Sequence, residues 1–477
     1  MLTRKELLKL GGAAAIAVVA PMKVAEGAIS EVSIKDLGAK GDGVADDTAP
    51  IQRAIQEMYN AGGGTVRIPA TDQFYKTTRA IDLKSDMLHP VTVVGVGNQS
   101  FIKNIATSGG LDFAPVFRIG RLVAGTGQYS GEAQTFHAIE AAAAGDTQIK
   151  PNAPPGTFHV GDMLLIRGEY YQHGPEQLRP LKPQINVVTS LQSGGYLSLA
   201  DPLADPQPNG FVAVYPYGVS YGAISNLRYE QSEQQLSILG FGAIAGGGAY
   251  RIGLSNLTMS RGASIISCNG LSRCLIENVH GSVAKKGFET AYYSHSTTLR
   301  NCSVRGLDGV SDIDMSLIIT EAAHRMVVED STFDVRGKAP RTESLAETYG
   351  AVGFLGATRL NAISRCTVRT NRHKRAAVIS GTAEKPTLSN WITDCTIVGD
   401  GADHVLRVAT PGQNTGAHSI VYNAISGSGA QYDVLIGSGT NGCVVTNNVL
   451  PEGVRNLGQN NTVQNNSKTD TPDTGPR

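Results

Sequence analysis

Three carboxylates on two expected strands are the residues of this sequence most suited to catalysis. If the apolar residues of 311–319 face a core, Asp312 and Asp314 face outward, roughly 6.5 to 7 Å apart. Glu289, on the outward side of 287–293, is then expected about 5 Å away on the adjacent strand. Such crowding raises the pKa of at least one carboxyl group and so supplies the acid and the base that glycosidic cleavage needs.

Two simpler interpretations of this acidic pair stay open. Asp312 and Asp314 are equally consistent with solvated turn carboxylates or with ligands of a calcium ion. Beyond that calcium alternative, the sequence predicts no cofactor and no structural zinc site, because the six cysteines form no CxxC pair and no cysteine–histidine zinc spacing.

Basic and aromatic residues are expected to surround the carboxylates and to bind substrate: Lys286, Tyr293, His324, Arg375 and Arg407. Arginine and lysine can hold the carboxylate of a uronate sugar. Lys286, Tyr293, His324 or Arg375 could instead remove the proton beside that carboxylate in a β-elimination. A lyase is therefore the alternative to a hydrolase.

A repeat from residue 220 onward positions these candidates. Its clearest column recurs at irregular intervals, as expected for stacked rungs with constant strands and variable loops. The column consists of Asn226, Asn256, Asn278, Asn301, Asp330, Arg365, Asp394, Asn423 and Asn447. Stacked asparagines can hydrogen-bond along the column. The strands about ten residues later, at 287–293, 311–319, 349–354, 375–379 and 404–408, should form one parallel sheet.

The next column holds small residues expected to be buried, namely Val279, Cys302, Ser331, Cys366 and Cys395. Cys366 and Cys395 stand on neighbouring rungs, so a disulfide is one alternative. A stack of buried thiols is the interpretation that we favour.

The segment 32–69 predicts a strand, a glycine turn, a helix and a second strand. Asp46 or Asp47 can accept hydrogen bonds from the free amides at the start of the helix. An apolar stripe at helical spacing, formed by Ile51, Ala54, Ile55 and Met58, is suited to close the end of an open core.

The patterns D-x-G-A-x-G-D-G-x-x-D-D-T-x-x-I-Q-x-A-I and G-G-G-x-V-x-I-P in this segment are similar to the N-terminal cap of the pectate-lyase-like β-helix superfamily. That superfamily includes polygalacturonases, rhamnogalacturonases, several lyases and phage tailspike depolymerases. The resemblance implies a right-handed parallel β-helix that acts on carbohydrate. The N-T-D, D-D, G-H-G and R-I-K signatures of polygalacturonases do not occur in the expected places, so the resemblance assigns no catalytic residue.

We expect the chain to divide into an export signal at 1–28, a cap with first rungs at 29–120 and an inserted antiparallel β module at 121–215. The main β-helix body is expected at 216–459 and a disordered tail at 460–477. The signal resembles a twin-arginine export signal, with Lys5 in place of the second arginine. Export to the periplasm or the exterior is the expected localisation.

The 41 basic and 41 acidic residues cancel, which disfavours nucleic acid as a partner. The apolar run at 10–20 is too short to span a membrane.

We expect an all-β, right-handed parallel β-helix with an N-terminal capping helix and an inserted antiparallel module. Its expected partner is a polysaccharide, and a homo-oligomer stays open. The first functional hypothesis is a glycoside hydrolase using Asp312, Asp314 and Glu289. A polysaccharide lyase and a non-catalytic, tailspike-like glycan-binding protein are the alternatives.

Overall fold

The computed structural model describes residues 31–107, 113–120, 135–168, 170–174, 177–180, 182–232, 242–307, 315–335, 350–371, 375–381, 387–409 and 418–468. The described chain forms two compact units. The N-terminal unit contains residues 31–282 and 288–298, and the C-terminal unit contains residues 283–287 and 299–468. The expected export signal at 1–28 and the acidic pair Asp312 and Asp314 lie outside the described residues.

The N-terminal unit begins with the capping segment. Strand β1 (Glu31–Ser33) pairs in parallel with β2 (Gly64–Arg67), and the helix α2 (Thr48–Asn60) connects them. The apolar stripe of α2 is buried as expected, with Ile51, Ala54, Ile55 and Met58 at most 1% exposed. This burial provides most of the stability that such a short helix needs.

The two aspartates before α2 have different roles. Asp46 Oδ1 accepts the backbone N–H of Thr48 at 3.0 Å, which satisfies the first helical amide. Asp47 instead accepts the amides of Lys40 at 2.6 Å and Gly41 at 3.0 Å, so it fixes the preceding turn. Gly41 has a φ of +66° and a side chain there would collide with Tyr75, which explains the glycine. The helix-capping prediction is confirmed for Asp46.

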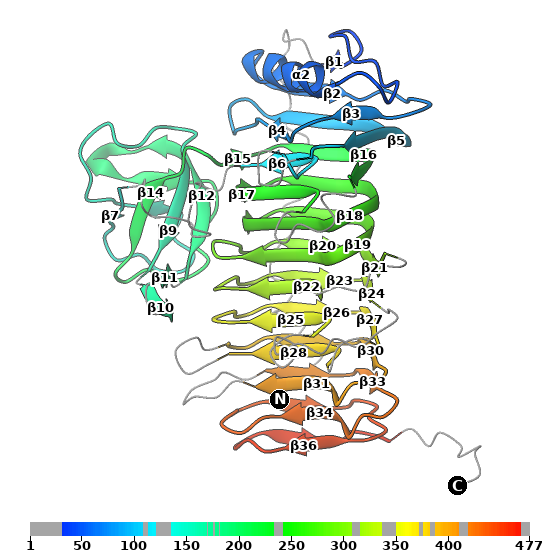
Figure 1. Ribbon diagram of the computed structural model, residues 1–477. Helices are drawn as coiled ribbons and strands as arrows, with labels where there is room; N and C mark the ends of the chain where they lie inside the picture. The colour runs from blue at the N-terminus through cyan, green and yellow to red at the C-terminus, as the bar shows by residue number, and fades with distance from the viewer. Residues whose placement is uncertain are drawn as a thin grey trace. The chain divides into compact units, whose positions relative to one another are not determined.

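Parallel strands stack below the cap in the N-terminal unit (Figure 1). One series pairs β2 with β5, β5 with β16 and β16 with β18, and a second series pairs β4 with β6, β6 with β17 and β17 with β18. The bounds are β3 Tyr75–Thr77, β4 Ile81–Leu83, β5 Val91–Asn104, β6 Phe117–Ile119, β15 Val219–Ser220, β16 Ala223–Gln231, β17 Ile244–Tyr250, β18 Gly253–Ser272 and β19 Leu275–Ala291.

An antiparallel module interrupts these strands between β6 and β15, beside the rungs of the same unit (Figure 1). Its main sheet has the order β7-β14-β9-β12-β13-β8 and encloses a core of its own that includes Leu164, Ile166 and Val212. The bounds are β7 His137–Ala138, β8 Gln148–Ile149, β9 Met163–Arg167, β10 Tyr170–Gly174, β11 Gln177–Pro180, β12 Gln184–Leu191, η2 Ser193–Gly195, β13 Leu197–Leu199 and β14 Phe211–Val214.

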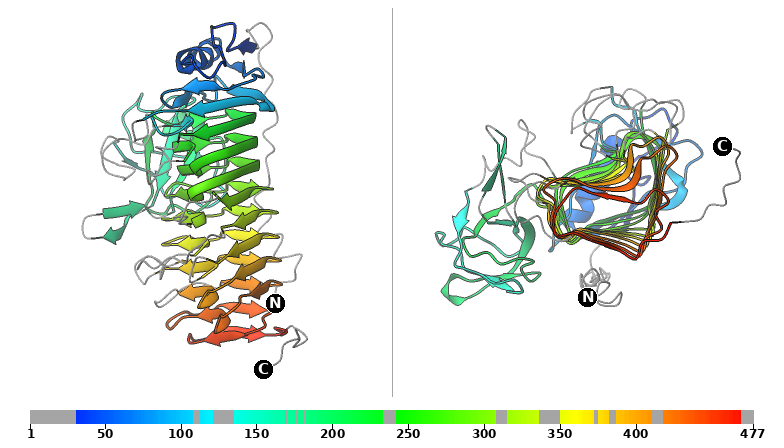
Figure 2. Two further views of the ribbon diagram at one scale, coloured as in Figure 1. Left: turned by 45° about the vertical axis from the view of Figure 1, so that its right-hand side comes forward. Right: turned by 90° about the horizontal axis from the view of Figure 1, so that it is seen from below.

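Three parallel stacks form the C-terminal unit. They are β23-β26-β29-β32-β35-β37, β21-β24-β27-β30-β33 and β22-β25-β28-β31-β34-β36. The view along the stack shows the strands of successive rungs superposed (Figure 2). Within the described residues, the third stack contains 315–319, 352–354, 377–379 and 404–408 of the segments expected to pair, and β19, which includes 287–291, pairs with β22. The expected pairing of these segments in one parallel stack is confirmed for β22, β25, β28 and β31.

The bounds of these strands are β20 Thr298–Arg300, β21 Ser303–Gly306, β22 Met315–Thr320, β23 Val327–Glu329, β24 Thr332–Asp334, β25 Val352–Leu355, β26 Ala362–Ser364, β27 Thr367–Thr370, β28 Ala377–Ser380, β29 Trp391–Thr393, β30 Thr396–Gly399, β31 His404–Ala409, β32 Ser419–Val421, β33 Ala424–Ser426, β34 Tyr432–Ile436, β35 Val444–Thr446, β36 Val454–Asn456 and β37 Thr462–Gln464. Strand β37 lies in the segment expected to be a disordered tail. Because β37 pairs with β35, the β-helix extends beyond the boundary predicted at residue 459.

The polar column from the sequence marks a turn in the left-handed backbone region. Asn226, Asn256 and Asn278 have φ values of 55°, 53° and 54°, a conformation that asparagine tolerates better than most residues. Each side-chain amide donates to the asparagine of the preceding rung, from Asn256 to Asn226 and from Asn278 to Asn256, both at 2.9 Å. The hydrogen-bonded asparagine ladder is therefore confirmed on these rungs.

One member of the predicted column was wrong. Tyr422, with a φ of 59°, occupies the left-handed turn, whereas Asn423 is buried in the neighbouring column. The Oδ1 of Asn423 accepts the amide of Cys395 at 2.9 Å, and Asn448 Oδ1 accepts the amide of Asn423 at 2.9 Å. An asparagine side chain that hydrogen-bonds to both neighbouring rungs contributes more to stability inside the stack than in an exposed turn.

The small-residue column is buried as expected. Cys302, Ser331, Cys366 and Cys395 are each 2% exposed, and the six cysteines are buried thiols. The amide of Cys366 donates to Sγ of Cys395 at 3.4 Å. Together the stacked rungs, the capping helix and the inserted antiparallel module make this chain an all-β, right-handed parallel β-helix, as the sequence predicts.

Candidate functional site

Glu289 is the one described residue of the expected catalytic carboxylates. It lies on β19, is half-buried, and accepts a hydrogen bond from the Ser267 hydroxyl at 3.0 Å. Asp312 and Asp314 lie outside the described residues, so their catalytic role stays a prediction.

The strand after the acidic pair does not alternate as the sequence suggested. The amides of Ser316 and Leu317 both donate to the carbonyl of Ala351, at 2.8 and 3.2 Å, so the backbone bulges there. Met315, expected to face inward with Leu317, instead packs with Ile318 in a separate cluster that includes Leu355 and Val378. The assumption of strict alternation used to orient Asp312 and Asp314 is therefore wrong at the residue that follows them.

Two expected substrate-binding residues are buried inside their own units. Tyr293 is 3% exposed and packs in an apolar cluster with Ile185 and Tyr215 of the inserted module. His324 is fully buried in a turn, with Nδ1 3.3 Å from the carbonyl of Ala322. Lys286, on β19, is half-buried.

Arg375, which is 7% exposed, and Arg407, which is half-buried, both lie near His404 in the C-terminal unit. Arg407 of β31 stands in register with Leu435 of β34, which in turn stands in register with Arg455 of β36. His404 pairs with Tyr432 on the same two strands, and their rings stack at 6.3 Å between centroids. The guanidinium group of Arg455 lies 5.5 Å from the Tyr432 ring centroid.

We call the group formed by Arg375, His404, Arg407, Tyr432 and Arg455 the basic face. Burial lowers the pKa of His404, and the positive charges of Arg375, Arg407 and Arg455 lower that pKa further, against the opposing effect of Asp403. His404 is thus a neutral imidazole at neutral pH, able to accept a proton. Its Nδ1 atom is buried and makes no hydrogen bond within the described part of the chain.

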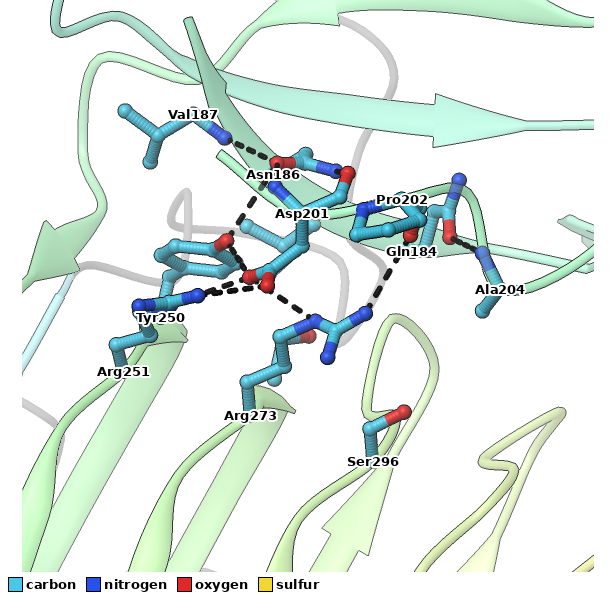
Figure 3. A network of polar contacts seen from close by, with 12 residues as sticks. Gln184, Asn186, Val187, Asp201, Pro202, Ala204, Tyr250, Arg251, Arg273 and Ser296 are labelled. Atoms are coloured by element: carbon cyan, nitrogen blue, oxygen red, sulfur yellow. Dashed lines mark hydrogen bonds and ion pairs between the residues drawn. The ribbon is translucent and has the colours of Figure 1, made fainter. Parts of the chain in front are cut away.

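A second polar cluster joins the module to the rungs of the N-terminal unit (Figure 3). Asp201, which follows β13 and is 8% exposed in its side chain, contacts two arginines of successive turns. Arg251 Nη2 lies 2.6 Å from Asp201 Oδ1, and Arg273 Nε lies 3.0 Å from Asp201 Oδ2. The Tyr250 hydroxyl also donates to Asp201. Asn186 donates from its side-chain amide to the Asp201 carbonyl at 2.8 Å.

This cluster is a structural anchor rather than a catalytic group. Burial and the charge of Asp201 raise the pKa of Tyr250 well above its usual value, so Tyr250 keeps its proton and donates a hydrogen bond to the carboxylate. The carboxylate oxygens of Asp201 are occupied by two ion pairs and this hydrogen bond. Apolar contacts among Met163, Ile185 and Tyr250 continue the same interface.

Several residues of these clusters were missing from the sequence-based site. His404 and Arg407 stood in a recognised strand, but only Arg407 was selected. Arg455 lies in a segment without a clear repeat motif, and only strand pairing places it beside β34. The anchor had one detectable signal in the sequence: Arg251 and Arg273 stand four and five residues before Ser255 and Asn278 of the repeat, at the start of successive rungs.

Metal and membrane features can be stated for the described ranges alone. There, histidine, cysteine, aspartate and glutamate side chains do not assemble in threes that could hold a metal ion. The calcium alternative for Asp312 and Asp314 falls outside these ranges and stays a prediction. Over the same ranges, no helix has the length and apolar character that a membrane span requires.

Comparison with known sequences identifies the capping region. Residues 31–111 match the family model described as rhamnogalacturonase A/epimerase, pectate lyase-like. A mannuronan C5-epimerase, AlgE5 of Azotobacter vinelandii, is 62% identical over 40 residues, which are 8% of this chain and 4% of that protein. Alginate lyase 7 of the same organism is 58% identical over 40 residues, 8% of this chain and 5% of the lyase. The matched segment thus spans a small part of each relative.

Solved structures of other β-helix proteins resemble the whole chain more loosely. The A-module of the Azotobacter vinelandii mannuronan C-5 epimerase AlgE6 is 12% identical, with a TM-score of 0.48, and the match covers 93% of this chain and 100% of that one. The tailspike gp61 of Pseudomonas phage phi297 is 13% identical, with a TM-score of 0.43 and coverage of 90% and 74%.

The cap geometry and the family match agree on the same segment, because the Asp46, Asp47 and Gly41 contacts lie inside residues 31–111. Residues 31–111 are therefore similar to the pectate-lyase-like family of the rhamnogalacturonase A/epimerase type, and the chain as a whole folds as a parallel β-helix.

Proposed function

We propose that this protein is an enzyme that acts on an acidic, uronate-containing polysaccharide, and that the basic face binds the uronate. The observation that carries the proposal is the placement of Arg375, Arg407 and Arg455 around His404 in one unit. Guanidinium groups bind carboxylates through paired, charge-assisted hydrogen bonds. A polymer with a carboxylate on each sugar matches a row of cations along stacked strands.

The same residues suit removal of the proton beside the carboxylate. Arginine contacts neutralise the carboxylate, which stabilises the negative charge that develops when the adjacent carbon loses its proton. His404, neutral because its pKa is lowered, is the proposed acceptor of that proton. Tyr432, whose ring stacks on that of His404, is the proposed donor of a proton to the sugar or to a leaving oxygen.

The names of the sequence relatives support this chemistry. They are enzymes of mannuronan and of alginate, which are polymers of uronic acids, and both epimerisation and elimination begin with removal of that proton. The sequence match covers only the cap, so it supports the class of substrate and leaves the choice between the two outcomes to experiment.

Hydrolysis is the second candidate. Glu289 is a half-buried carboxylate held by Ser267, an environment suited to an acid or a base. In this alternative Asp312 and Asp314 act with Glu289, as the sequence suggested. Complete activity in the Asp312→Asn, Asp314→Asn double variant would exclude this route.

The test incubates the purified chain with polymannuronate, polygalacturonate and a neutral glucan as separate substrates. Ultraviolet absorbance of an unsaturated uronate reports elimination, exchange of solvent deuterium into intact polymer reports epimerisation, and new reducing ends without absorbance report hydrolysis. We expect elimination or deuterium exchange on a polyuronate. Reducing ends alone would favour hydrolysis, and binding without any product would favour a non-catalytic glycan-binding protein.

Variants of the basic face connect this activity to the proposed site. Arg407→Gln and Arg455→Gln should each lower kcat/KM by roughly ten- to a hundredfold, because each removes a charge-assisted hydrogen bond worth about 1.5 to 3 kcal/mol. The matched control is Arg369→Gln on β27, an exposed arginine of another stack in the same unit. Equal activity of the Arg407→Gln, Arg455→Gln double variant and the control would contradict the proposed site.

A further inference from the structure

A pocket of about 480 Å³ opens in the N-terminal unit, where the cap, a rung and the inserted module meet. The cap contributes Gln52, Gln56 and Tyr59 of α2, and the module contributes Asp162 and Tyr217. Between them, the rung segments contribute Asp82, Lys84, Asp86 and Arg118. Its volume lies within the range of small-molecule sites, and its lining combines aromatic rings with several polar groups.

The polar groups of this pocket hold one another in place. Arg118 forms a two-point ion pair with Asp82, whose second contact, from Nη2 to Oδ2, measures 2.7 Å. The Tyr59 hydroxyl donates to Asp86 at 2.5 Å. Lys84 Nζ lies 4.2 Å from the Tyr59 ring centroid and donates to the Gln56 side chain at 3.3 Å. A ligand would therefore meet donors and acceptors that are already positioned, which reduces the entropy cost of binding.

Tyr217 supplies an exposed aromatic surface at the module side of the pocket. Its side chain is 40% exposed, although it belongs to a large and partly apolar residue type. The buried Tyr215 ring meets it edge to face, with centroids 6.0 Å apart and an interplanar angle of 81°. Gly218 follows directly, and a side chain there would collide with Met163 Sδ, so the backbone beside Tyr217 is closely packed. The ring is thus packed against Tyr215 while part of its surface stays exposed.

The charges of the lining distinguish this pocket from the basic face. Apart from the paired Asp82 and Arg118, the lining holds two carboxylates, Asp86 and Asp162, and one cation, Lys84. This balance repels a uronate and favours a ligand that offers hydroxyl hydrogens to carboxylate oxygens. The C–H face of a sugar ring is slightly positive and packs on the negative face of an aromatic ring.

We propose that this pocket is a second carbohydrate-binding site, which takes a neutral sugar unit stacked on Tyr217 with its hydroxyl groups bonded to Asp86 and Asp162. The site is independent of the proposed catalytic reaction and lies in the other compact unit. It gives the inserted module a function in glycan recognition beyond its packing on the rungs.

The test uses the full chain and measures binding of cellotriose, mannotriose and xylotriose, each as a separate probe, by saturation-transfer NMR and titration calorimetry. We expect at least one neutral trisaccharide to bind and a trimannuronate to bind more weakly at this pocket. Tyr217→Ala should weaken the neutral binding roughly three- to tenfold, the range expected for loss of one aromatic contact. Tyr422→Ala, which removes a tyrosine 44% exposed on a turn of the C-terminal unit, is the matched control and should bind as the wild type does.

Three outcomes would overturn the proposal: no binding of any of the three neutral probes, unchanged binding by Tyr217→Ala, or preferential binding of trimannuronate that depends on Tyr217. Asp86→Asn provides a second test, because it weakens hydroxyl binding without removing the tyrosine. The two proposals fail separately. Loss of polyuronate activity in Arg407→Gln with retained neutral binding concerns only the basic face, and loss of neutral binding in Tyr217→Ala with retained activity concerns only this pocket.

Discussion

Asp201 and Arg251, fifty residues apart in the chain, meet in a two-point ion pair with contacts of 2.6 and 3.1 Å. The pair ties the end of β13 in the inserted module to the turn after β17 in the rungs. Because Asp201 is almost fully buried and also contacts Arg273, its charge is satisfied only while the module is docked.

Replacing Asp201 with asparagine should therefore loosen the module. The change leaves two partly buried guanidinium groups without their carboxylate, a loss of about 3 to 5 kcal/mol in the free energy of unfolding. Urea unfolding measures the loss, and hydrogen exchange should show faster exchange in β12 and β13 than elsewhere. Glu140→Gln is the control in the same module: its ion pair with Lys150 is 58% exposed at the glutamate, so its loss should cost below about 1 kcal/mol. Equal stability of the two variants would show that the anchor does not hold the module.

The asparagine ladder separates backbone strain from side-chain bonding. Asn256→Gly loses the hydrogen bonds to Asn226 and Asn278 but adopts the left-handed turn without strain. Asn256→Ala loses the same hydrogen bonds and also strains the left-handed turn. We expect the alanine variant to unfold about 1 to 2 kcal/mol more easily than the glycine variant, despite the greater flexibility of unfolded glycine chains. Urea denaturation of the pair measures the difference. A more stable alanine variant would mean that the turn conformation contributes little.

His418 should make the C-terminal unit sensitive to acid. Burial lowers the pKa of His418 to about 4, whereas an unfolded histidine titrates near 6.5. Above that higher value both states are neutral, so the free energy of unfolding is unaffected. As the pH falls from about 6.5 toward 4, the unfolded chain binds a proton that the folded chain excludes, and up to about 3 kcal/mol of stability is lost.

His418→Asn tests this expectation with little change in the stack. His418 Nδ1 accepts the amide of Asn390 at 3.2 Å, the same role that Asn390 Oδ1 performs for Asn361 at 3.0 Å. The asparagine variant should therefore unfold with a flatter pH dependence over this range. His159→Asn, at a histidine with a 73% exposed side chain, is the control and should keep the wild-type profile. Identical slopes in all three proteins would exclude His418 as the source.

The basic face predicts the pH dependence of polyuronate activity. Since His404 accepts a proton only when neutral, kcat/KM should rise with pH through a pKa below the ordinary histidine value of about 6.5 and then level off. Arg375→Gln removes one of the positive charges that lower this pKa, so the rising limb should move to higher pH. His404→Gln should abolish the limb together with most activity. A limb that is unmoved in Arg375→Gln would assign it to another group.

Local sequence was sufficient for the cap and the rung turns. The contacts of Asp46, Asp47 and Gly41 are made within one short segment, so their spacing alone defines the turn and the start of the helix. The asparagine column was detectable because its members occupy the same left-handed turn position on successive rungs. Asn423 was misassigned because the repeat shifts by one residue there, and only burial distinguishes the two columns.

The candidate site depended on contacts between distant segments. Tyr293 alternates outward as expected, yet the module covers it, and nothing within 287–293 reveals what lies above that strand. Met315 departs from simple alternation because a bulge forms against the neighbouring rung, where two amides share the carbonyl of Ala351. Arg455 joins Arg407 only through the register of three successive strands.

By itself, the sequence determined the β-helix, its capping helix and its stacked polar columns, because those features repeat local hydrogen bonding and burial at each rung. The tertiary structure decided which outward residues remain accessible, where the module docks through Asp201 and Arg251, and which cations gather around His404. These relationships arise between rungs and between segments, where loop length and docking set the neighbours, and a one-dimensional pattern carries no information about either.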